Sequence, residues 1–77
     1  MELPMTPEPV RLLDVVALLA DLPSAGLARG QVGTAVEQLT EDVFEVEFSD
    51  DEGCTYAMLP LRVDQLLVLR HHPMRAA

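Results

Sequence analysis

The chain has 77 residues, of which 49% are hydrophobic, so it forms one small domain with a packed core. This length excludes most enzymes that hold a cofactor between two domains. Thirteen acidic residues face five arginines and no lysine, and the resulting net charge of −8 disfavours binding to nucleic acid or to an anionic membrane surface. No apolar run approaches the ~20 residues that span a bilayer. We therefore expect a soluble, cytoplasmic protein.

The first nine residues hold three prolines and no periodic pattern, which predicts a flexible arm over residues 1–9. The stretch over residues 10–22 is almost entirely apolar, and its periodicity permits either a helix or a buried strand. We prefer a strand, because residues 14–19 form a short continuous apolar run, typical of a strand covered on both sides. Residues 21–30 contain a proline and two glycines and predict a loop, either functional or held against the domain by Leu22 and Leu27.

From residue 31 onward, apolar and polar residues alternate with a period of two, which is typical of antiparallel strands with one buried face. The strand around residues 44–48 should bury Phe44, Val46 and Phe48. A three-residue loop over residues 40–42 would then place Val36 opposite Val46, on the core side of the preceding strand. In that strand, Gly33 is expected to allow a sharp bend.

A second hairpin is predicted at residues 49–53, with Gly53 in a left-handed conformation. An odd loop length would keep the faces in phase and bury three further residues: Cys54, Tyr56 and Met58. Pro60 should end this strand because proline cannot donate to the ladder. A single helical turn over residues 61–64 and a final strand over residues 65–70 follow.

This order of elements is that of an all-β, five-stranded SH3-like barrel over residues 10–70, followed by a tail over residues 71–77. The strings LLDVVAL, GLARGQVGTAVE and VFEVEFSDDEGCTYAML resemble a group of small bacterial proteins of unknown function, described as SH3-like, over about residues 12–69. The segment RGQVGT also resembles the start of KOW-type barrels and of the nitrile hydratase β-subunit barrel. The resemblance implies the fold and no catalytic residues, and the basic residues that KOW proteins use on nucleic acid are absent.

Four groups of residues are candidates for a chemical site. The consecutive carboxylates at residues 50–52 splay apart on a tight turn, which favours a solvated acidic tip over a calcium site. Cys54 should be buried and inert, and the adjacent His71 and His72 diverge too far to bind one metal. The glycines of RGQVGT lack the helix and lysine of a phosphate loop. We therefore expect no catalytic residue, no cofactor and no metal, and hence not an enzyme.

Glu37, Glu45 and Glu47 should face outward on two paired strands, beside acidic hairpin tips. This pattern favours a surface for a protein partner that is itself basic. We predict a non-catalytic protein-interaction module, an accessory or regulatory partner and possibly antitoxin-like in form. The alternative is a structural subunit of an enzyme complex, resembling the nitrile hydratase β-subunit barrel. The hypothesised partner-binding residues are Glu45, Glu47, Asp50, Asp51, Glu52, Arg29 and Leu27.

Overall fold

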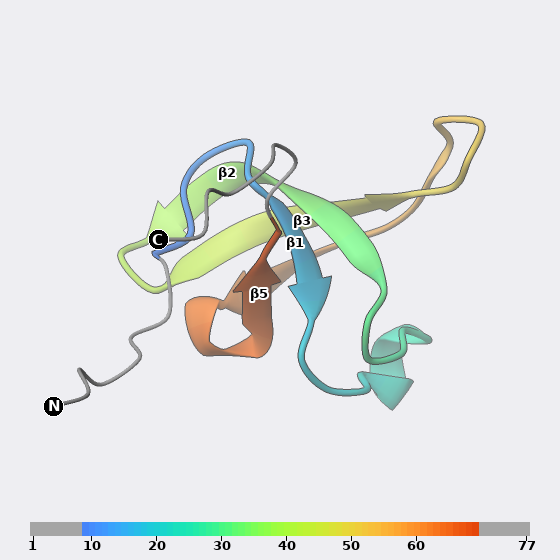
Figure 1. Ribbon diagram of the computed structural model, residues 1–77, viewed down its shortest axis with the longest axis horizontal. Coiled ribbons are helices and arrows are strands. Elements are labelled where there is room, and N and C mark those ends of the chain that lie inside the picture. Colours follow the sequence, from blue (N-terminus) through green and yellow to red (C-terminus); the bar gives the residue numbers. More distant parts are fainter. Residues whose placement is uncertain (1–8, 70–77) are drawn as a thin grey trace, which may run out of the picture.

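The computed structural model describes residues 9–69 and shows an all-β domain with one five-stranded antiparallel sheet (Figure 1). The strands lie in the order β4-β3-β2-β1-β5. Their bounds are β1 (Val15–Leu18), β2 (Val32–Thr40), β3 (Val43–Ser49), β4 (Thr55–Arg62) and β5 (Leu66–Val68). Single 3₁₀ turns, η1 (Pro23–Ala25) and η2 (Val63–Gln65), lie before β2 and β5.

The all-β fold and the choice of a strand within residues 10–22 are confirmed. The predicted turn before the last strand is also present, two residues later than expected at its start. The expected arm, apart from Pro9, lies outside the described residues, as do Arg70 and the expected tail over residues 71–77.

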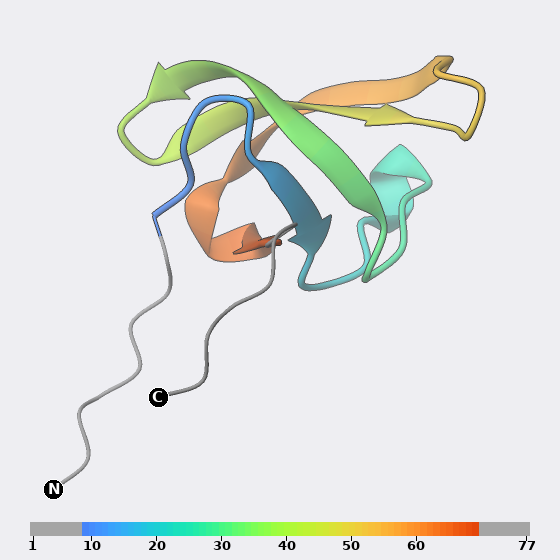
Figure 2. The ribbon, with the colours of Figure 1, turned by 45° about the horizontal axis from the view of Figure 1, so that its top comes forward.

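β2 joins two halves of the sheet, one formed with β1 and β5 and the other with β3 and β4 (Figure 2). Side chains from both halves pack into a single core, so the inner faces of the two halves oppose each other. The sheet is not closed into a barrel, because among the described residues β4 pairs with β3 alone and β5 with β1 alone. The most deeply buried large side chains are Phe44, Phe48, Val16 and Val46.

The loop between β1 and β2 is held against the domain, as one of the two readings of the sequence predicted. Leu22 and Leu27 exchange backbone hydrogen bonds of 2.8 and 3.1 Å, and Leu27 is only 4% exposed in the core. The Gly30 N–H donates to the Leu18 carbonyl at 2.8 Å and returns the chain to the sheet.

The predicted phase of β2 is wrong. Gly33 and Ala35 face the core, and Val46 lies opposite Ala35 rather than Val36. The side chain of Val36 is half-buried and does not belong to the core cluster. In the sequence, the alternation of the larger apolar side chains predicts that the opposite face of β2 is buried. The space inside the bent sheet accepts only small residues, because a Cβ at Gly33 would lie 3.0 Å from Phe48 Cδ2.

Register shifts in β2 correct the expected pairing further on. The pairing moves from Ala35 opposite Val46 to Glu37 opposite Glu45, which leaves Val36 as the extra residue of a β-bulge. A second shift leaves Leu39 unpaired, so β2 reaches Thr40 and the predicted loop over residues 40–42 shortens to two residues. The bulges change which side chains face outward in the second half of β2.

The predicted inward face of β4 is also wrong. A register shift after Phe48 leaves Tyr56 unpaired, so Cys54, Tyr56 and Met58 are all exposed. In their place, the side chains that pack against or within the core are Ala57, Leu59 and Leu61. Pro60 lies within β4 rather than ending it. Proline is tolerated there because β4 is an edge strand, where a missing N–H breaks no ladder bond if it points away from the sheet.

Candidate functional site

Three glutamates share the outer face of β2 and β3, and we call Glu37, Glu45 and Glu47 the acidic surface. Glu37 lies directly opposite Glu45 across the two strands, and Glu47 follows two residues along β3. Like charges in directly opposed positions destabilise a sheet. Within residues 9–69, the ion pair that the structure shows joins Arg62 to Asp64 at 3.1 Å, so no described cation is in direct contact with the acidic surface.

Apolar side chains flank the acidic surface on the edge strand β4. Met58 lies opposite Glu47, and Pro60 lies opposite Glu45. Met58 is 49% exposed, and Pro60 is exposed as well. The Thr55 hydroxyl donates a 2.6 Å hydrogen bond to Glu47 Oε2 and holds that carboxylate on the outer face. The outer face of β3 and β4 therefore places carboxylates beside exposed apolar groups, a combination suited to a partner with both basic and apolar side chains.

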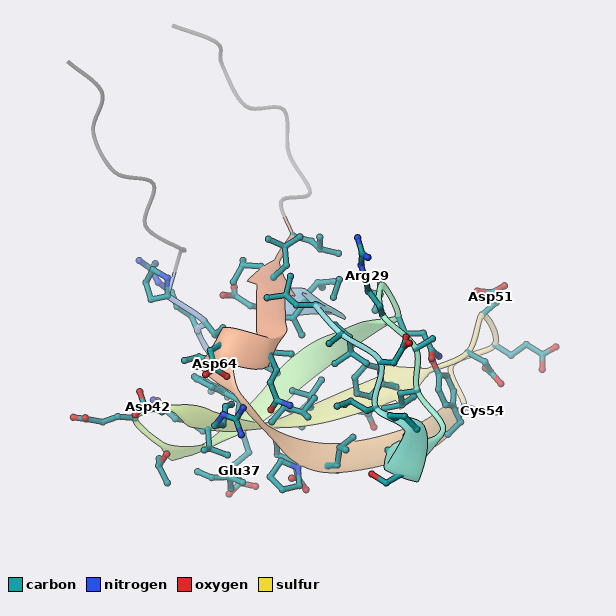
Figure 3. The ribbon with its side chains drawn as sticks, turned by 90° about the horizontal axis from the view of Figure 1, so that it is seen from below. Arg29, Glu37, Asp42, Asp51, Cys54 and Asp64 are labelled. Carbon is teal, nitrogen blue, oxygen red and sulfur yellow. The ribbon has the colours of Figure 1, made fainter. Side chains whose placement is uncertain are left out.

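The carboxylates at the tip of the β3–β4 hairpin differ in role: one organises the turn, and the others are exposed to solvent. Asp50 Oδ1 accepts the backbone N–H groups of Glu52 and Cys54, both at 2.9 Å, and so organises the turn. Gly53 has φ +84°, the left-handed conformation predicted for this position. Asp51 and Glu52 are exposed. Figure 3 shows Asp51 at the end of the hairpin away from Asp42.

We predict that Asp50→Ala lowers the free energy of unfolding by about 1–2 kcal/mol, since two backbone donors lose their acceptor. Asp51→Ala removes the same charge from a side chain that accepts no hydrogen bond within residues 9–69, and it should change stability by no more than about 0.5 kcal/mol. Urea titrations of both variants measure the difference. Equal effects would contradict a structural role for Asp50.

The two hypothesised loop residues lie elsewhere. Leu27 is buried in the core and presents no surface to a partner. The backbone N–H of Arg29 donates to Asp21 Oδ1 at 2.8 Å, and its side chain is exposed. In Figure 3, Arg29 and Glu37 lie on opposite sides of the domain. The structure therefore brings together Glu45 and Glu47 with Glu37, and it places the other predicted residues apart from them.

A second surface was not singled out from the sequence. The outward side of β1, β5 and the start of β2 is apolar, and we call this the apolar face; its residues are Val15, Ala17, Leu19, Val32, Leu67 and Leu69. Ala17 is the pairing partner of both Val32 and Leu67, so these three side chains form a row across the strands. Leu67 is 51% exposed, and Leu19 and Val32 are nearly as open.

A signal for this surface was present in the sequence. The apolar run over residues 14–19 predicts a strand covered on both sides. Within residues 9–69 the structure covers the inner side, where Val16 and Leu18 join the core. The strict alternation of β3 shows what a strand with one solvated face looks like in this chain. The excess apolar residues on β1 and β5 therefore mark an additional surface.

The described side chains that could act as a nucleophile or as metal ligands do not lie together. Cys54 is a free, exposed thiol rather than the buried residue that we expected. Within the described part of the chain, no three potential metal ligands lie together. His71 and His72 lie outside it.

The comparisons with known proteins identify a family and no function. The sequence pattern of the domain of unknown function DUF4926 matches residues 12–68, well over half of the chain. The chain belongs to this family. No curated protein and no solved structure matches it. The DUF4926 segment contains the whole acidic surface and, apart from Leu69, the whole apolar face.

The DUF4926 domain contains no membrane-crossing helix among the residues that the structure describes: none is both long enough and apolar enough.

Proposed function

We propose that this DUF4926 protein is a non-catalytic protein-interaction module that binds a basic partner through the acidic surface. The observation that carries the proposal is the direct opposition of Glu37 and Glu45, with Glu47 beside them and no described cation in contact. This arrangement is unfavourable in the free chain, because like charges repel at cross-strand distance. Lysine or arginine side chains of a partner would relieve the repulsion on binding.

The flanking residues make the surface more than a group of charges. Met58 and Pro60 line the acidic surface along β4 and would supply apolar contact area. Charge complementarity mainly accelerates encounter and selects the partner, whereas apolar contacts lengthen the life of the complex. A regulatory or accessory subunit that masks a basic surface, as an antitoxin masks a toxin, fits this division of roles.

The test starts with capture of partners from native lysate by the tagged, full-length protein, followed by association kinetics with the captured protein. We expect association to slow by roughly tenfold or more between low and high salt, because salt screens the attraction. A variant with Glu37, Glu45 and Glu47 all replaced by glutamine should show the same slowing at low salt. Its melting temperature should be unchanged or higher, because the repulsion is removed and glutamine retains an acceptor for the Thr55 hydroxyl.

A matched control loses three charges elsewhere: Glu41→Gln, Asp51→Asn and Glu52→Gln. All three positions are exposed, and none belongs to the acidic surface. This control should keep most of the association rate. If both triple variants slow association equally, net charge rather than the acidic surface is responsible, and the assignment is wrong. A partner whose enzymatic activity requires this chain would instead identify an enzyme subunit, the alternative predicted from the sequence.

A further inference from the structure

We propose that the apolar face and the acidic surface form one continuous surface that binds an amphipathic α-helix of the partner. Apolar side chains of this helix would cover β1 and β5, and its lysine or arginine side chains would lie over β3. The inference rests on the proposed function and names the structural element of the basic partner. It depends on the two surfaces lying side by side on the outer face of the sheet.

The strand register joins the two surfaces at β2. Val15 of the apolar face pairs with Thr34, and Thr34 pairs with Glu47 of the acidic surface. Neighbouring strands lie ~4.8 Å apart and directly paired residues point to the same side of a sheet, so Val15 and Glu47 lie about 10 Å apart on the outer face. Met58 follows Glu47 on β4. The outer face therefore presents apolar side chains, then carboxylates and then an apolar edge.

The apolar part of this surface is open to solvent. Ala17 pairs with both Val32 and Leu67, so these three side chains lie in one row. Val32 is 46% exposed and Leu67 51%, whereas Ala17 between them is only 8% exposed. Covering this row removes the two larger side chains from water, which favours association between proteins. The row carries no charge, so it selects apolar side chains, and the attraction for lysine and arginine is confined to the carboxylates beside it.

The backbone of the partner decides in favour of a helix. A segment that covers the face of a sheet receives no hydrogen bond from the ladder, because the ladder bonds lie in the plane of the sheet. Buried N–H and C=O groups of that segment must then be paired within the partner, and an α-helix pairs them along its length. Residues seven apart lie on one side of a helix, about 10 Å apart along its axis. This spacing matches the distance from the apolar row to the carboxylates.

The edges of the sheet are less suited to a partner than its outer face. β5 is only three residues long. β4 contains Pro60, which has no N–H to offer to an added strand. The Arg62 N–H already donates to Gln65 Oε1 at 2.8 Å. A strand added to either edge would therefore form few backbone hydrogen bonds, although such bonds supply the affinity in that mode of recognition.

Two synthetic peptides of about 18 residues test the proposal by NMR titration of the full-length protein. Both are alanine-based helices with two leucines one turn apart and two lysines. In the aligned peptide the lysines follow two turns further along the leucine face, about 10 Å away, and in the control peptide they lie on the opposite face. We expect the aligned peptide to shift the amide signals of both Ala17 and Glu47. It should bind at least about tenfold more tightly than the control peptide.

Leu67→Ser tests the apolar part of the surface without changing its charge. It should weaken binding of the aligned peptide by at least about threefold, because a covered leucine contributes to the affinity. The matched control is Leu39→Ser, since Leu39 is 45% exposed but lies on the second half of β2, outside the apolar face. Val32→Thr preserves the branched shape suited to a strand and takes the place of Leu67→Ser if that variant fails to fold.

Any of four results overturns the proposal. They are amide shifts confined to the acidic surface, equal affinity for the two peptides, equal effects of Leu67→Ser and Leu39→Ser, and no binding of the aligned peptide at ~1 mM. Failure of the proposed function has a different signature. Association with the captured protein is then insensitive to salt and to the triple glutamine variant, whatever the peptides do.

Discussion

Replacing Phe44 or Phe48 by alanine should unfold the domain or leave it barely folded at room temperature. Phe44 is 1% exposed and Phe48 0%, and both lie in the core that joins the two halves of the sheet. Removing a buried phenylalanine side chain destabilises a protein by ~3–5 kcal/mol, because apolar burial is lost and a cavity remains. A domain of this size has only about 5 kcal/mol in total. Thermal melting followed by circular dichroism measures the effect.

Met58→Ala is the matched control on the neighbouring strand. The alternation in the sequence predicted a buried Met58, whereas the structure leaves it 49% exposed. The structure therefore predicts a change of no more than about 0.5 kcal/mol. If Met58→Ala destabilised the domain as strongly as Phe44→Ala, the register of β4 against β3 would be wrong.

We expect the second large effect at Gly33. A Cβ atom there would lie 2.7 Å from the Glu47 carbonyl oxygen and 2.9 Å from Val46 Cγ1, closer than real Cβ contacts allow. Because the Glu47 carbonyl is backbone, β3 itself must move to admit a side chain. Gly33→Val should lower stability by about 2–3 kcal/mol, a fall of roughly 10–20 °C in Tm for a small domain.

Thr34→Val creates the same side chain one residue further along β2, at a half-buried outward position, and should be nearly neutral. Gly33→Ala tests whether glycine is required for its backbone conformation or for the space against β3. Gly33 is not among the residues with positive φ, so alanine fits the backbone and would ordinarily stabilise the strand. A loss of stability in Gly33→Ala would show that space against β3 is the requirement. A gain would contradict the close approach.

Several features of this protein follow from its sequence alone. The strict alternation around Phe44, Val46 and Phe48 is a property of consecutive residues in one strand, so the buried face of β3 could be predicted without knowing its neighbours. The proline and glycines of residues 21–30 likewise marked the long loop, and Gly53 marked the second turn. The order of these elements was sufficient for the all-β fold, and the outward position of Glu45 and Glu47 came with it.

The tertiary structure alone decided which residues face each other across the strands. Val36, Leu39 and Tyr56 drop out of the ladder, and each such residue changes which face the strand presents on one side of it relative to the other. Bulges depend on how two paired strands curve around the same core, and no local pattern records that curvature. As a result, small residues occupy the core-facing positions of β2, Met58 lies on the surface, and Glu37 lies opposite Glu45. Among residues 9–69 the outer side of β1 has no second layer. Whether a strand is covered on both sides depends on how many layers the whole chain builds, which a local pattern does not record.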